Sequence, residues 1–267
     1  MSALAALFEK TRSENRAALI GYLPAGFPSK EECIMGIQAM VNGGVDAVEI
    51  GFPYSDPVMD GPVIQAAADL ALSNGTGASD VFDIVEATVK MGVPTVVMTY
   101  WNPIERYGVT KFAAELARRG GSGVITPDLT IEESVTWQQA SAAAGTDRIY
   151  VVAPSTTEKR LPLVTAQCSG FIYAASLMGV TGTRTSVSGN ARELVARIRE
   201  TSSTPVAVGL GVSNKDQAHE VASYADGVIV GSAFIRQLQE SSSIHEGLEK
   251  VEALARSLSE GVRRKKC

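Results

Sequence analysis

Short apolar runs alternate with longer amphipathic segments along this chain. The short runs are rich in valine, isoleucine and alanine, which is typical of buried β-strands. The predicted strands are residues 17–23, 47–50, 95–99, 123–126, 148–152, 171–175, 205–209 and 227–231. The segments between them carry apolar residues three and four positions apart, which predicts surface helices packed on a core. Clear examples are residues 30–44, 79–92, 109–120 and 191–200.

This alternation predicts a (β/α)8 barrel, the TIM-barrel fold. Strands separated by helical segments are too far apart for hairpins, so they must be parallel and joined by crossovers. Eight such units favour a closed barrel over an open doubly wound sheet, and no GxGxxG nucleotide motif follows the first strand. No linker or change in composition divides the chain, so we expect residues 1–267 to form one domain.

Composition and charge limit the possible partners. The chain has 267 residues, 45% of them hydrophobic and 20% charged, and a formal net charge of −5. An acidic chain is a poor nucleic-acid binder, because such binding needs a basic face. No segment approaches the roughly 20 apolar residues of a membrane span, and the first residues lack the apolar core of a signal peptide. We expect neither nucleic acid nor membrane as a partner.

The cysteines indicate the compartment. Cys33, Cys168 and Cys267 are scattered without any CxxC spacing. This usage favours a reducing compartment over a disulfide framework, and it offers no zinc site. We therefore expect a cytoplasmic protein that binds no metal.

Glu49 is a candidate for acid–base chemistry. It alternates with Val48 and Ile50 in the second predicted strand, so it points to the opposite face from both. If the apolar pair faces the helices, Glu49 points into the barrel near its catalytic end, where burial should raise its pKa. A carboxyl with a pKa near neutrality can serve as general acid and base. A structural glutamate paired with a buried cation, or an outward Glu49, is the alternative.

Two connections are longer than the others, residues 51–61 and residues 176–189. Loops at the carboxyl ends of barrel strands are commonly lids or binding loops. The first of these holds Asp56 and Asp60 among prolines and glycines. From the pattern alone, either aspartate could instead support a turn or cap the following helix.

Glycines at the ends of the last two strands predict a phosphate site. Gly209 and Gly211 close the seventh strand, and Gly231 and Ser232 follow the eighth, just before a helical segment. Barrels often bind phosphate at these two loops, where glycine lets the backbone approach and a helix N-terminus offers free N–H groups.

These segments together resemble the tryptophan synthase α family over nearly the whole chain. Residues 49–65, EIGFPYSDPVMDGPVIQ, are similar to the family signature E-x-G-x-P-[FY]-S-D-P-x-x-D-G-P-x-I-Q. Residues 173–182, YAASLMGVTG, are close to the family's Y-x-x-S-x-x-G-V-T-G. The glycine sites of strands 7 and 8 fall where the family binds phosphate.

The resemblance implies a retro-aldol cleavage of indole-3-glycerol phosphate to indole and glyceraldehyde 3-phosphate, in L-tryptophan biosynthesis. By the family pattern, Glu49 handles the protons, and Asp60 accepts a hydrogen bond from the indole N–H and stabilises positive charge on the ring. The expected substrate-binding residues are Tyr22, Tyr100, Tyr173, Thr181, Gly182, Gly209, Gly211, Gly231 and Ser232.

The resemblance also implies a partner. Pro53 and Asp56 are expected to meet a tryptophan synthase β subunit in an αββα heterotetramer. The β subunit would carry pyridoxal phosphate (PLP), and this chain would need no cofactor. A free-standing indole-3-glycerol-phosphate lyase that acts without a β subunit is the alternative. A phosphosugar isomerase and a non-catalytic activator of a partner are more distant ones.

Three residues depart from what many family members carry. Tyr22 and Phe27 stand where phenylalanine and aspartate are frequent, and Trp101 stands where alanine is frequent. Tyr22 and Trp101 are expected to border the indole pocket, and Phe27 to affect the packing beneath the long loops. None of the three bears on the roles of Glu49 and Asp60.

Overall fold

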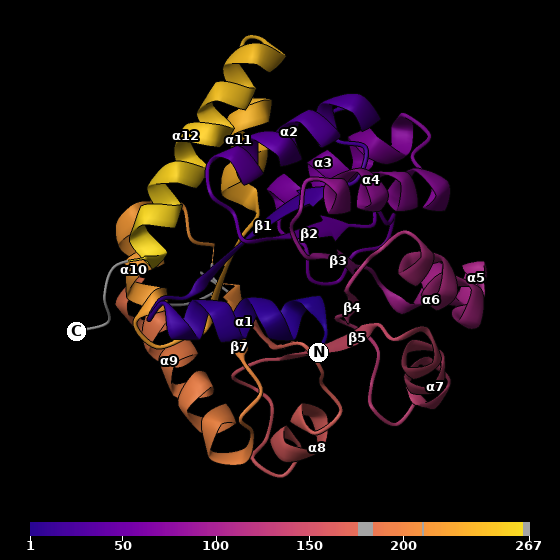
Figure 1. Ribbon diagram of the computed structural model, residues 1–267, viewed down its shortest axis with the longest axis vertical. Helices are drawn as coiled ribbons and strands as arrows, with labels where there is room; N and C mark the ends of the chain where they lie inside the picture. Colours follow the sequence, from indigo (N-terminus) through magenta and orange to yellow (C-terminus); the bar gives the residue numbers. More distant parts are fainter. Residues whose placement is uncertain (176–183, 210, 264–267) are drawn as a thin grey trace.

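Eight parallel strands close into a barrel in the order of the chain (Figure 1). The computed structural model describes residues 1–175, 184–209 and 211–263. The strands are β1 (Ala18–Pro24), β2 (Ala47–Gly51), β3 (Thr95–Met98), β4 (Gly123–Thr126), β5 (Asp147–Val152), β6 (Ile172–Ala175), β7 (Val206–Gly209) and β8 (Gly227–Val230). Each strand pairs with the next, and β1 also pairs with β8, which closes the sheet. The predicted TIM barrel is confirmed, and every predicted strand overlaps an observed one.

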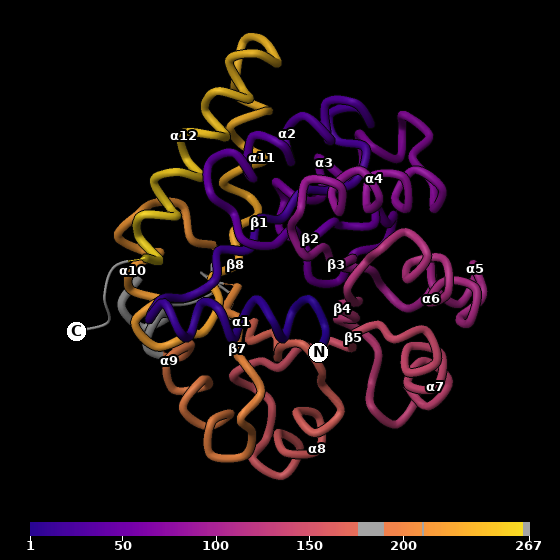
Figure 2. Tube along the Cα trace, viewed as in Figure 1, coloured from indigo at the N-terminus to yellow at the C-terminus, as the bar shows by residue number. Residues whose placement is uncertain are grey.

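Helices surround the barrel (Figures 1 and 2). They are α1 (Ala3–Ser13), α2 (Lys30–Asn42), α3 (Pro62–Ser73), α4 (Ala78–Lys90), α5 (Trp101–Tyr107), α6 (Val109–Arg118), α7 (Val135–Ala144), α8 (Leu161–Thr165), α9 (Arg184–Thr201), α10 (Lys215–Ala222), α11 (Ser232–Gln239) and α12 (Ile244–Val262). The last helix, α12, packs against α2, α10 and α11. The C-terminal helix therefore contacts both an early helix of the barrel and the last two helices before it.

One helix, α1, closes the N-terminal end of the barrel instead of covering its side (Figure 1). Leu4, Leu7 and Phe8 are buried in the same cluster as the inward-facing residues of the strands, such as Ile20. The ring of Phe8 lies 5.7 Å from that of Phe171 at the base of β6. An apolar plug therefore fills this end, and the opposite end, where the strands finish, is left for a site.

The connection after β6 is shorter than predicted. We expected a loop over residues 176–189, but α9 begins at Arg184. The prediction ended the loop at Gly189, and this was wrong because a glycine inside a helix costs only about 1 kcal/mol and is tolerated. Residues 176–183 lie outside the described part of the chain.

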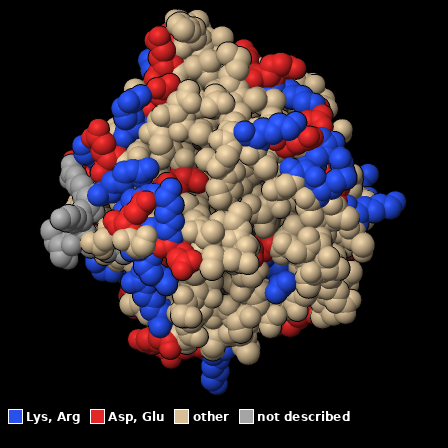
Figure 3. Space-filling view, viewed as in Figure 1, with Lys and Arg blue, Asp and Glu red and all other residues tan. Residues whose placement is uncertain are grey.

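Charged side chains of both signs are spread over the visible surface. On the face shown in Figure 3, basic and acidic side chains are intermixed and form no broad basic patch. Within the described residues, no helix is long and apolar enough to cross a membrane.

Candidate active site

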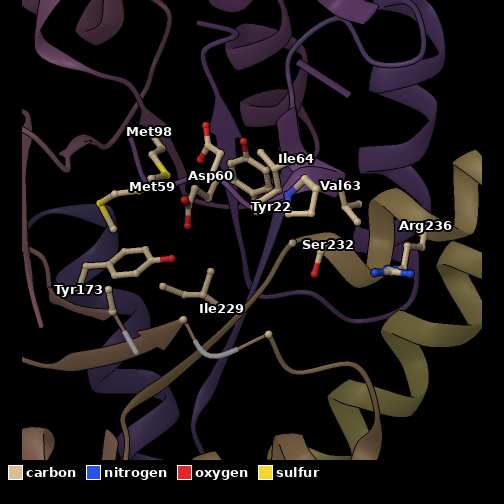
Figure 4. A pocket seen from close by; sticks show the side chains of 17 residues that line it. Tyr22, Met59, Asp60, Val63, Ile64, Met98, Tyr173, Ile229, Ser232 and Arg236 are labelled. Atoms are coloured by element: carbon tan, nitrogen blue, oxygen red, sulfur yellow. The ribbon is translucent and has the colours of Figure 1, made fainter. Parts of the chain in front are cut away.

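A cavity of about 320 Å³ opens at the carboxyl ends of the strands. Its wall includes Glu49 and Asp60, together with Tyr22 from β1 and Tyr173 from β6. Ser232 and Arg236 from α11 also line it, and Figure 4 shows Tyr173 and Arg236 on opposite sides. The cavity therefore lies where barrel enzymes place their active sites.

Glu49 points into this cavity, as predicted. Val48 and Ile50 pack in the layer between the strands and the helices, and Glu49 has the opposite orientation. Its side chain is only 1% exposed, and Oε2 has no hydrogen-bond partner among the described residues. Burial, with a smaller contribution from the negative charge of Asp60, raises the pKa of Glu49 to about 8. A paired structural glutamate is therefore excluded within the described residues.

Asp60 faces the same cavity from the loop after β2. The N-cap of α3 is Gly61, without any side-chain capping bond, so the Asp60 carboxylate does not cap that helix. Burial raises the pKa of Asp60, while a hydrogen bond with the Tyr100 side chain lowers it. The Asp60 side chain therefore lines the cavity and does not cap α3.

Tyr100 holds the loop that carries Asp60. The backbone N–H of Met59 donates a hydrogen bond of 3.1 Å to the Tyr100 hydroxyl. The Tyr54 ring lies 5.2 Å from the Tyr100 ring, and the Asn102 amide donates to the Tyr54 hydroxyl at 3.0 Å. The described cavity wall does not include Tyr100, so its direct contact with substrate stays a prediction.

Two tyrosines shape the walls, and each lies against a glycine. The Tyr22 ring packs over Gly51 and Gly231, where a Cβ at Gly231 would approach the ring to 2.9 Å. A Cβ added at Gly209 would lie even closer to the Tyr173 hydroxyl, so there is no room for a side chain there. Burial raises the pKa of both phenols well above the usual value, with further contributions from Glu49 and Asp60. Both rings therefore stay neutral beside the carboxyls.

The glycine end of the cavity has the features of an anion site. Gly209, Gly211, Gly231 and Ser232 all line it, and Gly211 has a positive φ of 65°. The first helical bonds of α11 are donated by Phe234 and by the next residue, both to the Gly231 carbonyl. The amides before them are left pointing out of the helix end, where an anion binds favourably.

The remaining predicted residues are distributed as follows. Thr181 and Gly182 lie outside the described part of the chain. Pro53 is buried, whereas Asp56 is exposed and accepts a hydrogen bond of 2.6 Å from the Ser55 hydroxyl. Of the residues that depart from the family, Phe27 is buried in the layer under the helices and Trp101 does not line the described cavity.

Several wall residues were not predicted. They include Met59, Met98, Val63, Ile64, Ile229 and Arg236 (Figure 4). The alternation of β3 could have indicated Met98, since it has the same orientation as the inward Val96. The four-residue spacing from Ser232 to Arg236 on one helix could have indicated Arg236.

Metal ligation is not supported in the described residues. They contain no group of three or more histidine, cysteine, aspartate or glutamate side chains that could hold an ion.

A barrel with a buried carboxyl at the end of β2 and an exposed helix end after β8 belongs to the class of α/β-barrel enzymes that act on phosphorylated substrates by acid–base chemistry. Comparison with known proteins narrows this class. The chain belongs to the tryptophan synthase alpha chain family, whose model matches residues 8–263. The reaction of this family is a lyase reaction that cleaves indole-3-glycerol phosphate.

Individual relatives agree over nearly the full length. The chain is 54% identical to the tryptophan synthase alpha chain of Thermobifida fusca over 266 residues, covering 98% of each chain. It is 56% identical to that of Streptomyces coelicolor over 253 residues, covering 94% of this chain and 93% of the relative. A solved structure of Mycobacterium tuberculosis tryptophan synthase superposes with a TM-score of 0.91 at 49% identity, covering 98% of each chain.

Proposed function

We propose that this chain cleaves indole-3-glycerol phosphate with Glu49 as its acid–base residue and Asp60 as its electrostatic partner. The observation that carries this proposal is the buried, unpaired Glu49 carboxyl, which shares one cavity with Asp60 and with the N-terminus of α11. A carboxyl with a pKa of about 8 holds a proton at neutral pH and can also take one up after losing it.

The proton transfers follow from the substrate. Protonation of the indole ring at C3 by Glu49 makes the ring an electron acceptor. Removal of the proton from the hydroxyl on the adjacent carbon lets that oxygen form an aldehyde. The carbon–carbon bond then breaks, its electron pair returns to the ring, and indole and glyceraldehyde 3-phosphate are formed. The two transfers leave no net proton on the protein.

Asp60 is proposed to stabilise the cationic ring. Protonation at C3 places positive charge on the indole nitrogen, and a carboxylate that accepts the N–H hydrogen bond interacts most strongly at that stage. Met98, Ile64 and Ile229 provide the apolar wall on which an indole ring can pack.

The phosphate is proposed to lie against Gly211, Gly231 and Ser232. Backbone N–H groups and the dipole of α11 favour a negative group at this position. Thr181 and Gly182 are proposed to contribute from the connection after β6, and Tyr22 and Tyr173 from the walls of the cavity.

The proposed partner is a tryptophan synthase β subunit that carries PLP, in an αββα heterotetramer in the cytoplasm. Similarity to the Mycobacterium tuberculosis tryptophan synthase structure supports this partnership. The exposed Asp56, on the loop that leads to Asp60, is the proposed point of contact, with the neighbouring Pro53.

The decisive assay measures indole release from indole-3-glycerol phosphate, with and without a β subunit. We expect slow release from the isolated chain and much faster release with the partner. No release under either condition would refute the proposed function. Full activity without the partner would instead identify a free-standing lyase.

A further inference from the structure

Arg236 is a basic side chain on the wall of a cavity whose other ionisable side chains, carboxyls and phenols, are acidic. Among the described wall residues, Glu49 and Asp60 are acidic, and Arg236 is the one lysine or arginine. Figure 4 shows Arg236 next to Ser232, on the side of the cavity away from Tyr173. The positive charge is therefore on the side of Ser232 and the N-terminus of α11.

The helix fixes this position. Ser232 and Arg236 are four residues apart on α11, so their side chains lie on the same face, one turn from each other. Ala233, Phe234 and Ile235 between them are buried against the barrel. For a group bound at the N-terminus of α11, Arg236 is therefore the next side chain along the helix that is not buried.

Arg236 has no strong partner within the described residues. Its guanidinium lies 3.7 Å from the Glu240 carboxylate, which is beyond hydrogen-bond distance, and the side chains are 55% and 67% exposed. An exposed ion pair of this kind contributes little to stability. The guanidinium can therefore turn to a more highly charged anion without a large loss of free energy.

A phosphate monoester supplies that anion, with a charge of about −1.5 to −2 at neutral pH. Backbone amides offer partial charges only, and the Asp60 carboxylate adds negative charge to the same cavity. The full positive charge of Arg236, next to the proposed phosphate position, offsets this negative charge.

We propose that Arg236 determines specificity for a phosphorylated substrate by supplying the counter-charge to the phosphate bound at the N-terminus of α11. This inference rests on the proposed function and extends it to a residue on the open face of the helix. Arg236 acts on binding and takes no part in the proton transfers.

The test compares Arg236→Gln, Arg236→Lys and a matched control, Arg256→Gln. Arg256 is also an exposed helical arginine paired with a glutamate four residues away, but it lies on α12, outside the cavity wall. Inorganic phosphate is titrated into each folded variant at low and high NaCl. KM and kcat for indole-3-glycerol phosphate are measured in the presence of the β subunit.

We expect Arg236→Gln to weaken phosphate binding and to raise KM by about 3- to 10-fold, with kcat nearly unchanged. Arg236→Lys should retain most of the affinity, since it keeps the charge. Salt should weaken phosphate binding less in Arg236→Gln than in the wild type, because one exposed charge contact is missing.

Phosphate affinity in Arg236→Gln equal to that of Arg256→Gln would overturn the inference. An equal loss in Arg236→Lys and Arg236→Gln would overturn it too, since the effect would then not follow charge. Failure of the proposed function is a separate result, because it would appear as absence of indole release from the wild-type protein.

Discussion

Tyr22 on β1 lies directly opposite Glu49 on β2 in the register of the barrel. Both side chains enter the cavity at the same level, and they are 7% and 1% exposed. Glu49 therefore has a large neutral ring beside it, and burial, with a smaller contribution from the charge of Asp60, raises its pKa. This environment keeps a proton on Glu49 at neutral pH.

The substitution Glu49→Gln should abolish nearly all cleavage while the fold and phosphate binding persist. Glutamine keeps the shape of the side chain but cannot transfer a proton, and such a loss is typically about 100- to 10,000-fold. Indole release and phosphate titration of the same preparation measure the two properties. A variant that retains a tenth of the wild-type turnover would remove Glu49 from the acid–base role.

The same substitution should stabilise the protein in a pH-dependent way. The pKa of Glu49 rises from its ordinary 4.5 to about 8 in the folded chain. Between these values the unfolded chain loses the proton that the folded chain keeps, so wild-type stability falls as pH rises. The stability gained in Glu49→Gln should therefore grow from about pH 4.5 and level off above about pH 8. Chemical denaturation across this range checks it, and a gain independent of pH would contradict the raised pKa.

The substitution Asp60→Asn should lower kcat more than it raises KM. The neutral amide can still accept a hydrogen bond, but it cannot balance the positive charge that develops on the ring. Steady-state kinetics with the β subunit separate the two constants. A raised KM with intact kcat would make Asp60 a binding residue.

Replacing Gly211 with leucine should weaken the binding of inorganic phosphate and of substrate together. Gly211 has a φ of 65°, which strains any larger residue, and it lines the cavity. Gly92→Leu is the control, since Gly92 has a φ of 85° and nothing within 4 Å of an added Cβ, and it precedes β3. Unchanged phosphate affinity in folded Gly211→Leu would move the phosphate elsewhere.

The substitution Asp56→Ala should reduce activation by the β subunit and spare the slow basal rate. Asp56 is exposed on the loop that leads to Asp60, so a partner that contacts it can alter the position of the Asp60 carboxylate. Indole release is measured against increasing β subunit. Glu200→Ala, at the exposed end of α9, is the control. Equal activation of Asp56→Ala and wild type would place the coupling in other residues.

The sequence allowed much of the fold and the centre of the site to be predicted, because both depend on local periodicity. The alternation of Val48, Glu49 and Ile50 was enough to direct Glu49 inward, and this is confirmed. The glycines at the ends of β7 and β8 were placed at the cavity by their position after each strand. That residues 1–267 form one domain stays a prediction.

Features that depend on contacts distant in sequence were not predictable. The bond from Met59 to Tyr100 joins residues 41 positions apart, and no local pattern encodes it. The closure of the barrel by α1 depends on Phe8 meeting Phe171, which only the finished barrel brings together. The boundary of α9 was missed because a single glycine does not end a helix.

The apolar plug formed by α1 closes one end of the barrel. With Leu4 and Phe8 filling the base, the cavity opens, among the described residues, where the strands end. If one substrate enters and two products leave through this opening, the order in which the products depart matters. Indole would form at the deeper carboxyl end and the aldehyde at the glycine end. A partner bound over this opening would then control both substrate entry and product release without contacting the reacting atoms.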